Sequence, residues 1–346
     1  MSDFIPPMEA LLAEELPQGP CWQFEPKWDG FRCIAVRDGG KVELWSKSGK
    51  PLGRYFPEIE AMLGRLKAGR FVIDGELLIV SGGAIAFDAL QMRLHPAASR
   101  IAKLAGETPA MFMAFDCLAA GKKMLGSKPL SRRRAELESL LAKEKEPTLL
   151  LSPATADRES AIRWLKRSGG ALDGVIAKRL DEPYRSGERA MIKVKQRRTA
   201  DCVVGGFRYG RNDRLVGSLL LGLYGDAGLL HHVGFTSSIA AKDRPAWTGE
   251  LEELVEPPGF TGNAPGGPSR WSTERTAQWQ PLRPKLVVEV LYDQVTAGRF
   301  RHGTRLLRRR PDKAPAQCTC DQLAHPMTPA QLEQLMEAWL PSGQGL

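Results

Sequence analysis

Long apolar segments are missing from this sequence of 346 residues. No apolar run reaches the roughly 18 residues that a membrane-spanning helix needs. The N-terminal stretch Met-Ser-Asp-Phe-Ile-Pro-Pro has no basic region followed by an apolar core, which excludes a secretory signal. The sequence therefore predicts a cytoplasmic protein without a membrane segment.

Cysteine is scarce: six cysteines are scattered along the chain, and only Cys318 and Cys320 lie close together, with His325 nearby. A structural zinc ion needs four ligands, so this pair is a poor candidate for a metal site. Cys33 and Cys117 lie in apolar runs, where cysteine acts as a small core residue. These positions indicate a reduced, cytoplasmic protein.

The sequence also lacks a Gly-x-x-x-x-Gly-Lys-Ser/Thr loop, which excludes a P-loop nucleotide site. Positive charge is in excess instead: Lys and Arg number 49, Asp and Glu number 40, and the net charge is +9. Such a balance favours polyanionic partners, nucleic acid or an anionic membrane, although a soluble basic enzyme has the same composition. The length suits two domains of roughly 100–200 residues each.

The first half of the chain alternates between strand-like and helix-like segments. Two paired strands are predicted at Phe31–Arg37 and Lys41–Trp45, joined by a turn at residues 38–40. Phe71–Val80 is an apolar, β-branched run, and two further buried strands are predicted at Met111–Leu118 and Leu172–Lys178. Helices are predicted at Pro57–Lys67, Ser131–Leu141 and Arg158–Ser168, the second capped by Ser131 and the third by Asp157. This half therefore mixes helices with buried strands.

After about residue 200 the pattern becomes one of short strands and Gly-rich turns. Strands are predicted at Asp201–Arg208, Gly217–Tyr224, Leu229–Phe235 and Lys285–Tyr292, which indicates a small five-stranded barrel. Residues 256–270 are a predicted loop, and residues 299–313 are densely basic, either a flexible tail or an ordered end of the barrel. A last helix is predicted from Thr328, with a capping box to Gln331.

Lys27 lies in the stretch Glu-Pro-Lys-Trp-Asp-Gly over residues 25–30. A lysine attacks as the free amine, and its ordinary pKa of about 10.4 opposes that, so neighbouring cations or a metal ion must favour the neutral form. By itself Lys-x-Asp-Gly is short enough to occur by chance in a surface turn. Its meaning depends on the rest of the chain.

Further motifs follow Lys27 in a fixed order that extends to residue 313. They are Ser46-Lys47-Ser48-Gly49 with Phe56-Pro57-Glu58, Asp74-Gly75-Glu76, Ala114-Phe115-Asp116, Asp173-Gly174-Val175, Lys193-Val194-Lys195 and Arg310-Pro311-Asp312-Lys313. Each is weak alone, but the ordered set resembles the covalent nucleotidyltransferase superfamily and, within it, the ATP-dependent DNA ligases. The C-terminal Cys-Thr-Cys-Asp-Gln-Leu is also similar to minimal bacterial ligases of the LigC type.

The resemblance implies that Lys27 is adenylylated and that Arg32 contacts AMP or phosphate. The other nucleotide contacts that it implies are Glu25, Lys47, Glu76 at the ribose, Phe115 stacked on adenine, Lys193 and Lys195 at the α-phosphate, and Arg310 and Lys313. This last pair is expected to reach the pyrophosphate in the first step and then swing away, which requires domain closure.

The residue types support parts of this chemistry independently. Mg²⁺ prefers one or two carboxylates with waters and phosphate oxygens, and Glu76 and Asp173 are the predicted carboxylates, with Mn²⁺ as the alternative metal. Lys193 and Lys195 are two apart on a strand-like segment, so both point to one face, where they can clamp the α-phosphate. Structural alternatives are a salt-bridged acid at 76, a turn former at 173, a core ring at Phe115 and a solvated lysine face.

Lys47 departs from the family pattern, because many members carry Arg at this position, where it is expected to meet phosphate. Lysine keeps the charge but loses the planar bidentate fork. Either a single-point contact from Lys47 suffices, or Arg54 takes the role. The sequence leaves both alternatives open.

The resemblance implies an α+β protein. A nucleotidyltransferase (ATP-grasp-like) adenylation domain would cover residues 1–198, a small OB-fold β-barrel 199–315, and a tail with a short helix 316–346. The motifs begin close to residue 1, so we expect no helical N-terminal DNA-binding domain.

The expected function is ATP-dependent sealing of 3′-hydroxyl/5′-phosphate nicks in double-stranded DNA through a lysyl-AMP intermediate. We expect a monomer that acts in DNA repair with other repair proteins. The alternatives are an RNA ligase or GTP-using capping guanylyltransferase, and a non-catalytic DNA-binding module with a decayed nucleotide site.

Overall fold

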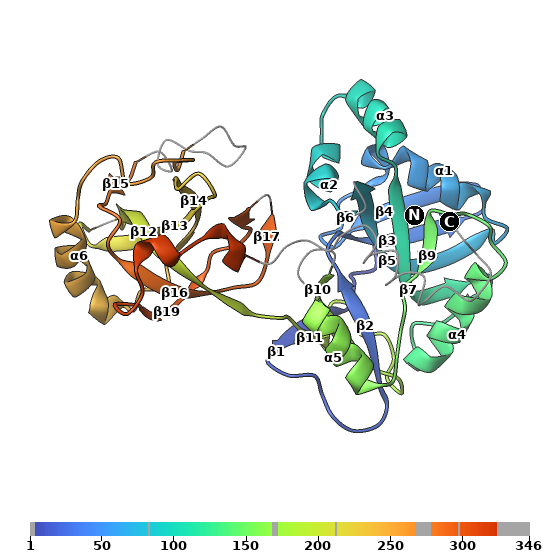
Figure 1. The fold of residues 1–346 in the computed structure, drawn as a ribbon. Helices are drawn as coiled ribbons and strands as arrows, with labels where there is room; N and C mark the ends of the chain where they lie inside the picture. The colour runs from blue at the N-terminus through green and yellow to red at the C-terminus, as the bar shows by residue number, and fades with distance from the viewer. Residues whose placement is uncertain are drawn as a thin grey trace. The chain divides into compact units, whose positions relative to one another are not determined.

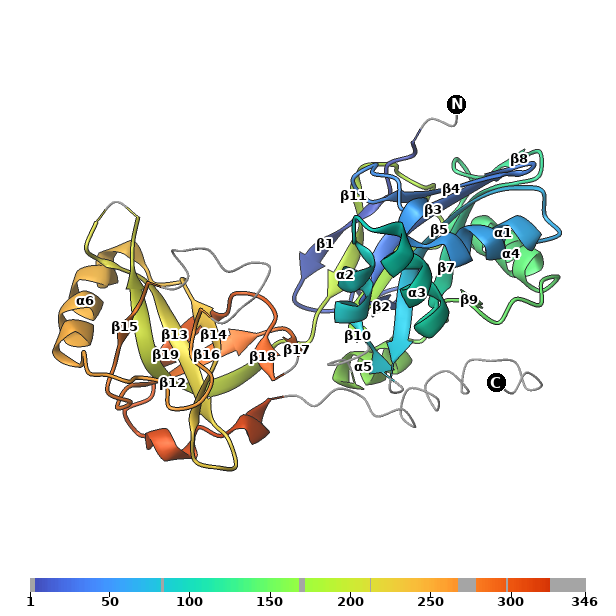
Figure 2. The same cartoon turned by 90° about the horizontal axis from the view of Figure 1, so that it is seen from above.

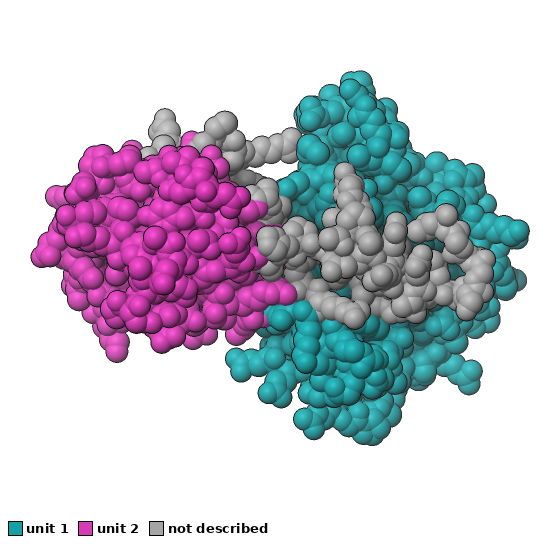
Figure 3. Space-filling view, in the orientation of Figure 1, with its two compact units in different colours: residues 1–196, 326–346 teal, residues 197–325 magenta. Residues whose placement is uncertain are grey.

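The computed structural model describes residues 4–81, 84–167, 172–211, 213–266, 278–296 and 298–323. They belong to two compact units, of which the first ends at Gln196 and the second begins at Arg197 (Figure 3). The helix predicted from Thr328 lies outside the described residues. No helix in the described part of the chain is long and apolar enough to cross a membrane.

The first unit contains two β-sheets. The larger is seven-stranded, with the central order β4 (Lys41–Ser46), β3 (Phe31–Asp38), β5 (Arg70–Ser81), β7 (Ala110–Ala120) and β8 (Lys123–Met124), while β6 (Ala84–Ile85) pairs with β5 and β9 (Leu149–Leu151) with β7. The smaller has four strands in the order β1 (Glu9–Ala13), β11 (Arg189–Val194), β10 (Leu172–Arg179) and β2 (Trp22–Trp28). Strands from opposite ends of this unit's sequence therefore pair directly (Figure 1).

Helices cover both sheets. In the larger sheet α1 (Pro57–Arg65) packs on β4 and β7, α2 (Phe87–Arg93) on β5 and α4 (Leu130–Leu141) on β7, while α3 (Ala98–Glu107) contacts α1. In the smaller sheet α5 (Arg158–Arg167) packs on β2 and β10 (Figure 2). Phe56, Phe71 and Phe112 are fully buried between helices and strands of the larger sheet.

The two helix caps predicted in the first unit have different outcomes. Asp157 precedes α5, and its carboxylate accepts a hydrogen bond from the Ser160 amide at 2.9 Å, which confirms the cap. The cap at Ser131 was wrong, because α4 begins one residue earlier, after Pro129, and no side chain caps it. Proline supplies a favourable φ at the helix start without a side-chain bond.

The second unit is an antiparallel, curled sheet. Its order is β14 (Leu230–Thr236), β13 (Val216–Tyr224), β12 (Arg198–Tyr209), β16 (Val287–Tyr292) and β19 (Arg305–Arg309), with β15 (Gln280–Pro281) paired to β12. A small hairpin joins β17 (Val295–Thr296) to β18 (Arg299–Phe300), and α6 (Arg244–Glu253) packs on β13. Leu306 of β19 pairs with Val290, so the basic segment is part of the sheet and the flexible-tail alternative was wrong.

The structure confirms the nine predicted strands within one or two residues at most ends. Sequence patterns missed β1 and β2 and identified only the end of β11, because apolar and charged residues do not alternate regularly in these strands and Pro26 interrupts β2. All six cysteines are free. No group of three or more His, Cys, Asp or Glu side chains is arranged for metal binding within the described ranges.

Candidate active site

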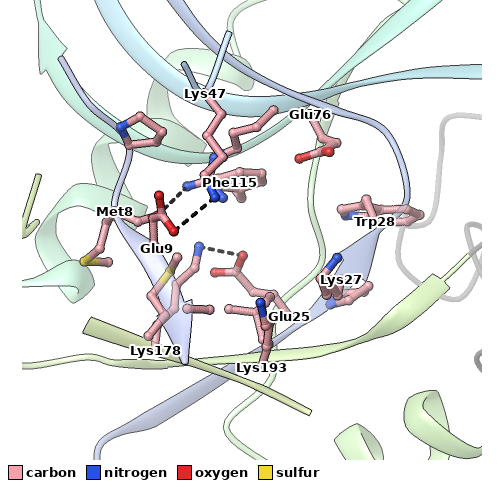
Figure 4. Close-up of a pocket in the computed structure, with 16 residues that line it drawn as sticks. Met8, Glu9, Glu25, Lys27, Trp28, Lys47, Glu76, Phe115, Lys178 and Lys193 are labelled. Carbon is pink, nitrogen blue, oxygen red and sulfur yellow. Dashed lines mark hydrogen bonds and ion pairs between the residues drawn. The ribbon is translucent and has the colours of Figure 1, made fainter. Parts of the chain in front are cut away.

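A cavity of about 230 Å³ lies between the two sheets of the first unit (Figure 4). Its walls come from β1, β2, β10 and β11 on one side and from β3, β5, β7 and the residue after β4 on the other. The lining residues are Pro7, Met8, Glu9, Ala10, Glu25, Pro26, Lys27, Trp28, Arg32, Lys47, Glu76, Phe115, Ile176, Lys178, Met191 and Lys193. Seven predicted site residues are among them, drawn together from segments up to residue 193.

Lys27 meets Asp173 through an irregularity in the pairing of β2 with β10. The register shifts between Leu172 and Val175, and Gly174 in this bulge has φ +137°. A Cβ there would lie 2.1 Å from the Val194 carbonyl oxygen, so only glycine fits. The bulge places the nearly buried Asp173 carboxylate in an ion pair with the Lys27 ammonium.

Lys195 pairs with the same carboxylate, at 3.0 Å from Oδ1 of Asp173. It follows β11 and does not line the cavity, whereas Lys193 within that strand does. Burial and the charges of Lys27, Lys195 and Lys47 lower the pKa of Lys193. Several ammonium groups thus gather at one end of the cavity, where an anion would relieve their mutual repulsion.

Glu25 is fixed at the inner wall by two donors. Gln23 Nε2 donates to its Oε1 at 2.7 Å, and Lys178 Nζ donates to its Oε2 at 2.8 Å. Glu25 and Lys178 are both buried, and the pairing of β2 with β10 places Gln23 opposite Lys178. Lys178 was not predicted, although it follows Asp-Gly-Val-Ile-Ala at the end of a recognised motif.

The Phe115 ring contacts two cations. The Arg32 guanidinium lies 4.4 Å from its centroid and the Lys178 ammonium 4.5 Å, within the range of cation–π attraction. Phe115 is almost buried, yet its ring lines the cavity, so it is more than a core residue.

Arg32 is oriented by Asp74, another residue that sequence reasoning did not select. Nε and Nη2 of Arg32 donate to the two carboxylate oxygens, each at 2.6 Å. The Tyr184 hydroxyl donates to the same carboxylate at 2.6 Å. Arg32 Nη1 has no partner in the described part of the chain and remains available to a ligand.

Glu76 lines the same wall of the cavity as Arg32, because the pairing of β3 with β5 places these two residues opposite each other, and Figure 4 shows it beside Phe115. Its carboxylate has no hydrogen-bond or ion-pair partner among the described residues, and burial raises its pKa to about 7. The turn after Lys27 packs closely against this part of β5. A Cβ added at Gly30 would lie 2.2 Å from the Leu77 carbonyl oxygen. An unpartnered carboxylate facing a cavity can accept a hydrogen bond from a hydroxyl group or bind a cation.

Lys47 and Arg54 occupy different surroundings. Lys47 lines the cavity, and its ammonium lies 3.0 Å from the Glu9 carboxylate, whose pKa it lowers. Arg54 does not line the cavity; its Nη2 donates to the Pro96 carbonyl at 3.0 Å. Of these two residues, Lys47 is therefore the one whose position allows contact with a ligand in this cavity.

Two family models match the chain. Residues 7–195 match the ATP dependent DNA ligase domain, and residues 212–313 match the ATP dependent DNA ligase C terminal region. The first match alone covers more than half of the chain. The chain belongs to the ATP-dependent DNA ligases.

Relatives of this ligase match along nearly its whole length. It is 45% identical to DNA ligase C2 of Mycolicibacterium smegmatis, over 93% of this chain and 96% of the relative. It is 41% identical to DNA ligase C of Mycobacterium tuberculosis, over 94% of this chain and 96% of the relative. These relatives support the predicted LigC type and an enzyme rather than a non-catalytic module.

A solved structure agrees with the fold. The ligase domain of M. tuberculosis LigD is 28% identical, covers 91% of this chain and 98% of that domain, and has a TM-score of 0.50. A Lig E DNA ligase, at 21% identity and a TM-score of 0.54, supports the fold alone. The ligase therefore combines an adenylation domain with an OB-fold domain, as predicted.

The predicted residues Arg310 and Lys313 lie in the second unit of the ligase. Arg310 Nη1 donates to Asp201 Oδ1 at 2.8 Å, and Lys313 Nζ donates to Asp201 Oδ2 at 2.8 Å. Arg310 Nη2 also donates to Asp312 at 2.9 Å. The structure thus brings these two cations together on one carboxylate, which sequence reasoning did not identify.

The ligase family uses ATP and generally a divalent metal ion. Asp173 forms an ion pair with Lys27, and the positive charge of Lys27 partly offsets the rise that burial causes in the pKa of Glu76. The unpartnered carboxylate of Glu76 fits a cation, and two acids are enough for Mg²⁺, which keeps waters and takes phosphate oxygens as further ligands.

Proposed function

We propose that this ligase seals nicks in double-stranded DNA through AMP held covalently on Lys27. The observation that supports this most directly is the ion pair of Lys27 with Asp173 at the edge of a cavity lined by Glu76, Lys47 and Lys193. This arrangement joins a nucleophile, carboxylates and cations, which together suit adenylyl transfer.

In the first step the Lys27 amine attacks the α-phosphorus of ATP. A nitrogen–phosphorus bond forms, the bond to the bridging oxygen breaks, pyrophosphate leaves with that electron pair, and the amine loses its proton to water. An oxygen of the 5′-phosphate at the nick then attacks the phosphorus of the bound AMP, the nitrogen–phosphorus bond breaks, and the Lys27 nitrogen takes a proton from water. Finally the 3′-hydroxyl attacks the phosphorus of the 5′-phosphate, the bond to AMP breaks, AMP leaves with that electron pair, and the hydroxyl proton passes to water as the strand closes.

The predicted site residues have the following roles in this proposal. Lys193 and Lys195 hold the α-phosphate as charge develops on it, Phe115 stacks on adenine, and Arg32 uses its available Nη1 on AMP or phosphate. Glu25 completes the nucleotide contacts. In the second unit Arg310 and Lys313 reach the pyrophosphate.

Glu76 and Asp173 would hold Mg²⁺, or Mn²⁺ in its place, and Glu76 would also contact the ribose. The ion would supply positive charge that polarises the phosphate oxygens. The domains would cover residues 1–198, 199–315 and 316–346.

The test is incubation with α-labelled ATP and Mg²⁺, followed by denaturation. We expect label on the wild-type chain and none on Lys27→Ala. The matched control is Lys103→Ala, since this exposed lysine of α3 pairs only loosely with Glu107 at 3.7 Å. Absence of label on the wild type would overturn the proposal, and label on Lys27→Ala would overturn the site.

Substrate choice needs a separate comparison. Labelling with ATP against GTP, and sealing of matched nicked DNA and nicked RNA, separate this proposal from an RNA ligase or guanylyltransferase. We expect ATP and DNA. Preference for GTP or for an RNA nick would refute it.

We further propose a monomer that acts in DNA repair and depends on other repair proteins. One group of relatives, at 32% identity over 86% of this chain, consists of LigD proteins named for non-homologous end joining. The isolated ligase should therefore seal nicks less well at physiological salt than a full-length replicative ligase. Equal sealing would refute the dependence on partners.

A further inference from the structure

Asp201 is a nearly buried carboxylate near the start of β12, with 8% of its surface exposed. Arg310 Nη1 lies 2.8 and 3.1 Å from its two oxygens, and Lys313 Nζ lies 2.8 Å from Oδ2. Both cations are far from Asp201 in sequence, by 109 positions for Arg310 and 112 for Lys313. One acid therefore joins two cations that the ligase motif places at the end of the barrel.

The backbone of Asp201 is also fixed. Its amide donates to Gln322 Oε1 at 2.9 Å, and its carbonyl accepts from Gln322 Nε2 at 3.1 Å. The same Nε2 lies 3.2 Å from the Thr319 carbonyl oxygen. Gln322 thus ties the segment after the barrel to β12, and the position of the carboxylate is determined from two sides.

The carboxylate changes what the two cations can do. Without the carboxylate between them, the guanidinium of Arg310 and the ammonium of Lys313 would repel each other and separate. With it, Arg310 and Lys313 are held at one spacing while each keeps further N–H donors for a ligand. Their side chains are only about one-fifth exposed, at 19% and 22%, so few other rotamers are open to them.

We propose that Asp201 is a positioning residue that preassembles Arg310 and Lys313 into a clamp for the pyrophosphate of ATP. This inference rests on the proposed function, in which the pair acts at the pyrophosphate in the first step. Asp201 itself does not touch the nucleotide. It should therefore matter for the formation of lysyl-AMP and not for closure of a nick that already carries AMP.

An opposing model has the same contacts. In this model Asp201 holds the two cations in an inactive position away from ATP. Removing the charge of Asp201 would then release them and accelerate the first step. The burial of Asp201 and its fixation by Gln322 favour the clamp, because a carboxylate that must let go during turnover would gain nothing from such a fixed backbone.

The experiment compares Asp201→Asn with the wild type in two assays. The first measures the rate of label incorporation from α-labelled ATP over a range of ATP concentrations. The second measures sealing of a pre-adenylylated nick without ATP. The matched control is Asp226→Asn, an exposed acid between β13 and β14. Asp201→Glu keeps a carboxylate and tests rescue.

We expect Asp201→Asn to lower the rate of lysyl-AMP formation by about 10- to 100-fold, the order expected for displaced positioning groups. Sealing of the pre-adenylylated nick should remain at the wild-type rate, and Asp201→Glu should recover part of the first step. A faster first step would overturn the clamp and support the model in which Asp201 holds the two cations away from ATP. Equal loss in both assays, with a lower melting temperature, would show a structural role only.

Arg310→Ala and Lys313→Ala, measured in parallel, separate the two levels of the proposal. If both leave lysyl-AMP formation unchanged, the proposed role of the pair fails, and the clamp with it. If both lower it while Asp201→Asn does not, the pair acts in the first step and only the inference about Asp201 fails.

Discussion

Oδ2 of Asp173 is paired with the ammonium of Lys27, while Oδ1 of the same carboxylate lies 3.0 Å from Lys195. One acid thus connects the predicted nucleophile of β2 to the lysine that follows β11. The connection depends on the bulge at Gly174, which turns Asp173 toward both. Five predictions concern this site and the core that supports it.

Gly174→Ala should reduce lysyl-AMP formation by about 100-fold or more, because the new Cβ displaces the bulge and with it the Asp173 carboxylate. The added atom would lie 2.1 Å from the Val194 carbonyl oxygen, at a φ of +137°. Label incorporation from ATP measures the effect.

Gly106→Ala is the control for this change, since no atom lies within 4 Å of a Cβ there and the site is helical. It should keep full activity and gain up to about 1 kcal/mol of stability. Normal adenylylation of Gly174→Ala would show that the bulge is not needed.

Glu76 should make the first step sensitive to pH. Burial raises its pKa to about 7, so the carboxyl gains a proton as the pH falls through that value and can no longer serve as an anion. The rate of lysyl-AMP formation should therefore decrease below pH 7. A rate that is constant between pH 8 and pH 6 would contradict this assignment.

The same group should affect stability with the opposite sign. An unfolded glutamate titrates near 4.3, so between that value and about 7 the folded protein binds more protons and gains stability as the pH falls. Above pH 7 Glu76 is ionised in the folded protein, and the free-energy cost of burying its charge lowers the stability in full. Glu76→Gln should thus raise the melting temperature more at pH 8 than at pH 5, and an equal gain at both would refute the shift.

Lys47→Ala should raise the KM for ATP about tenfold, because a hydrogen bond to a charged group contributes about 1.5–3 kcal/mol. Arg54→Ala is the comparison and should leave KM unchanged, since Arg54 bonds to the Pro96 carbonyl outside the cavity. Initial rates over a range of ATP concentrations measure both. A larger effect of Arg54→Ala would assign the phosphate contact to Arg54 instead.

Arg133→Met should destabilise the ligase by about 3–5 kcal/mol, because it leaves the Asp116 carboxylate buried without its partner. Nε and Nη2 of Arg133 donate to Asp116 at 2.7 and 3.0 Å, and both side chains are 1% exposed. Denaturant unfolding measures the loss. Arg132→Met, at the exposed neighbour on α4, should change little, and equal stability of the two variants would contradict the role of the pair.

Local sequence patterns were sufficient for most elements of the fold. Apolar runs identified β3, β5 and β7, and Asp157 identified the start of α5. They failed for β2, where Pro26 and Lys27 interrupt any alternation. A strand whose side chains serve a site is selected for chemistry rather than for periodicity, so its pattern is weak.

The sequence by itself determined the family, the order of the motifs and the residue types at the cavity, because covalent chemistry requires those groups within short, recognisable segments. Only the tertiary structure decided which side chains pair with one another. Lys178 on Glu25, Asp74 on Arg32 and Asp201 on Arg310 are contacts between distant segments. Such partners are set by strand register, bulges and burial, which no local pattern encodes.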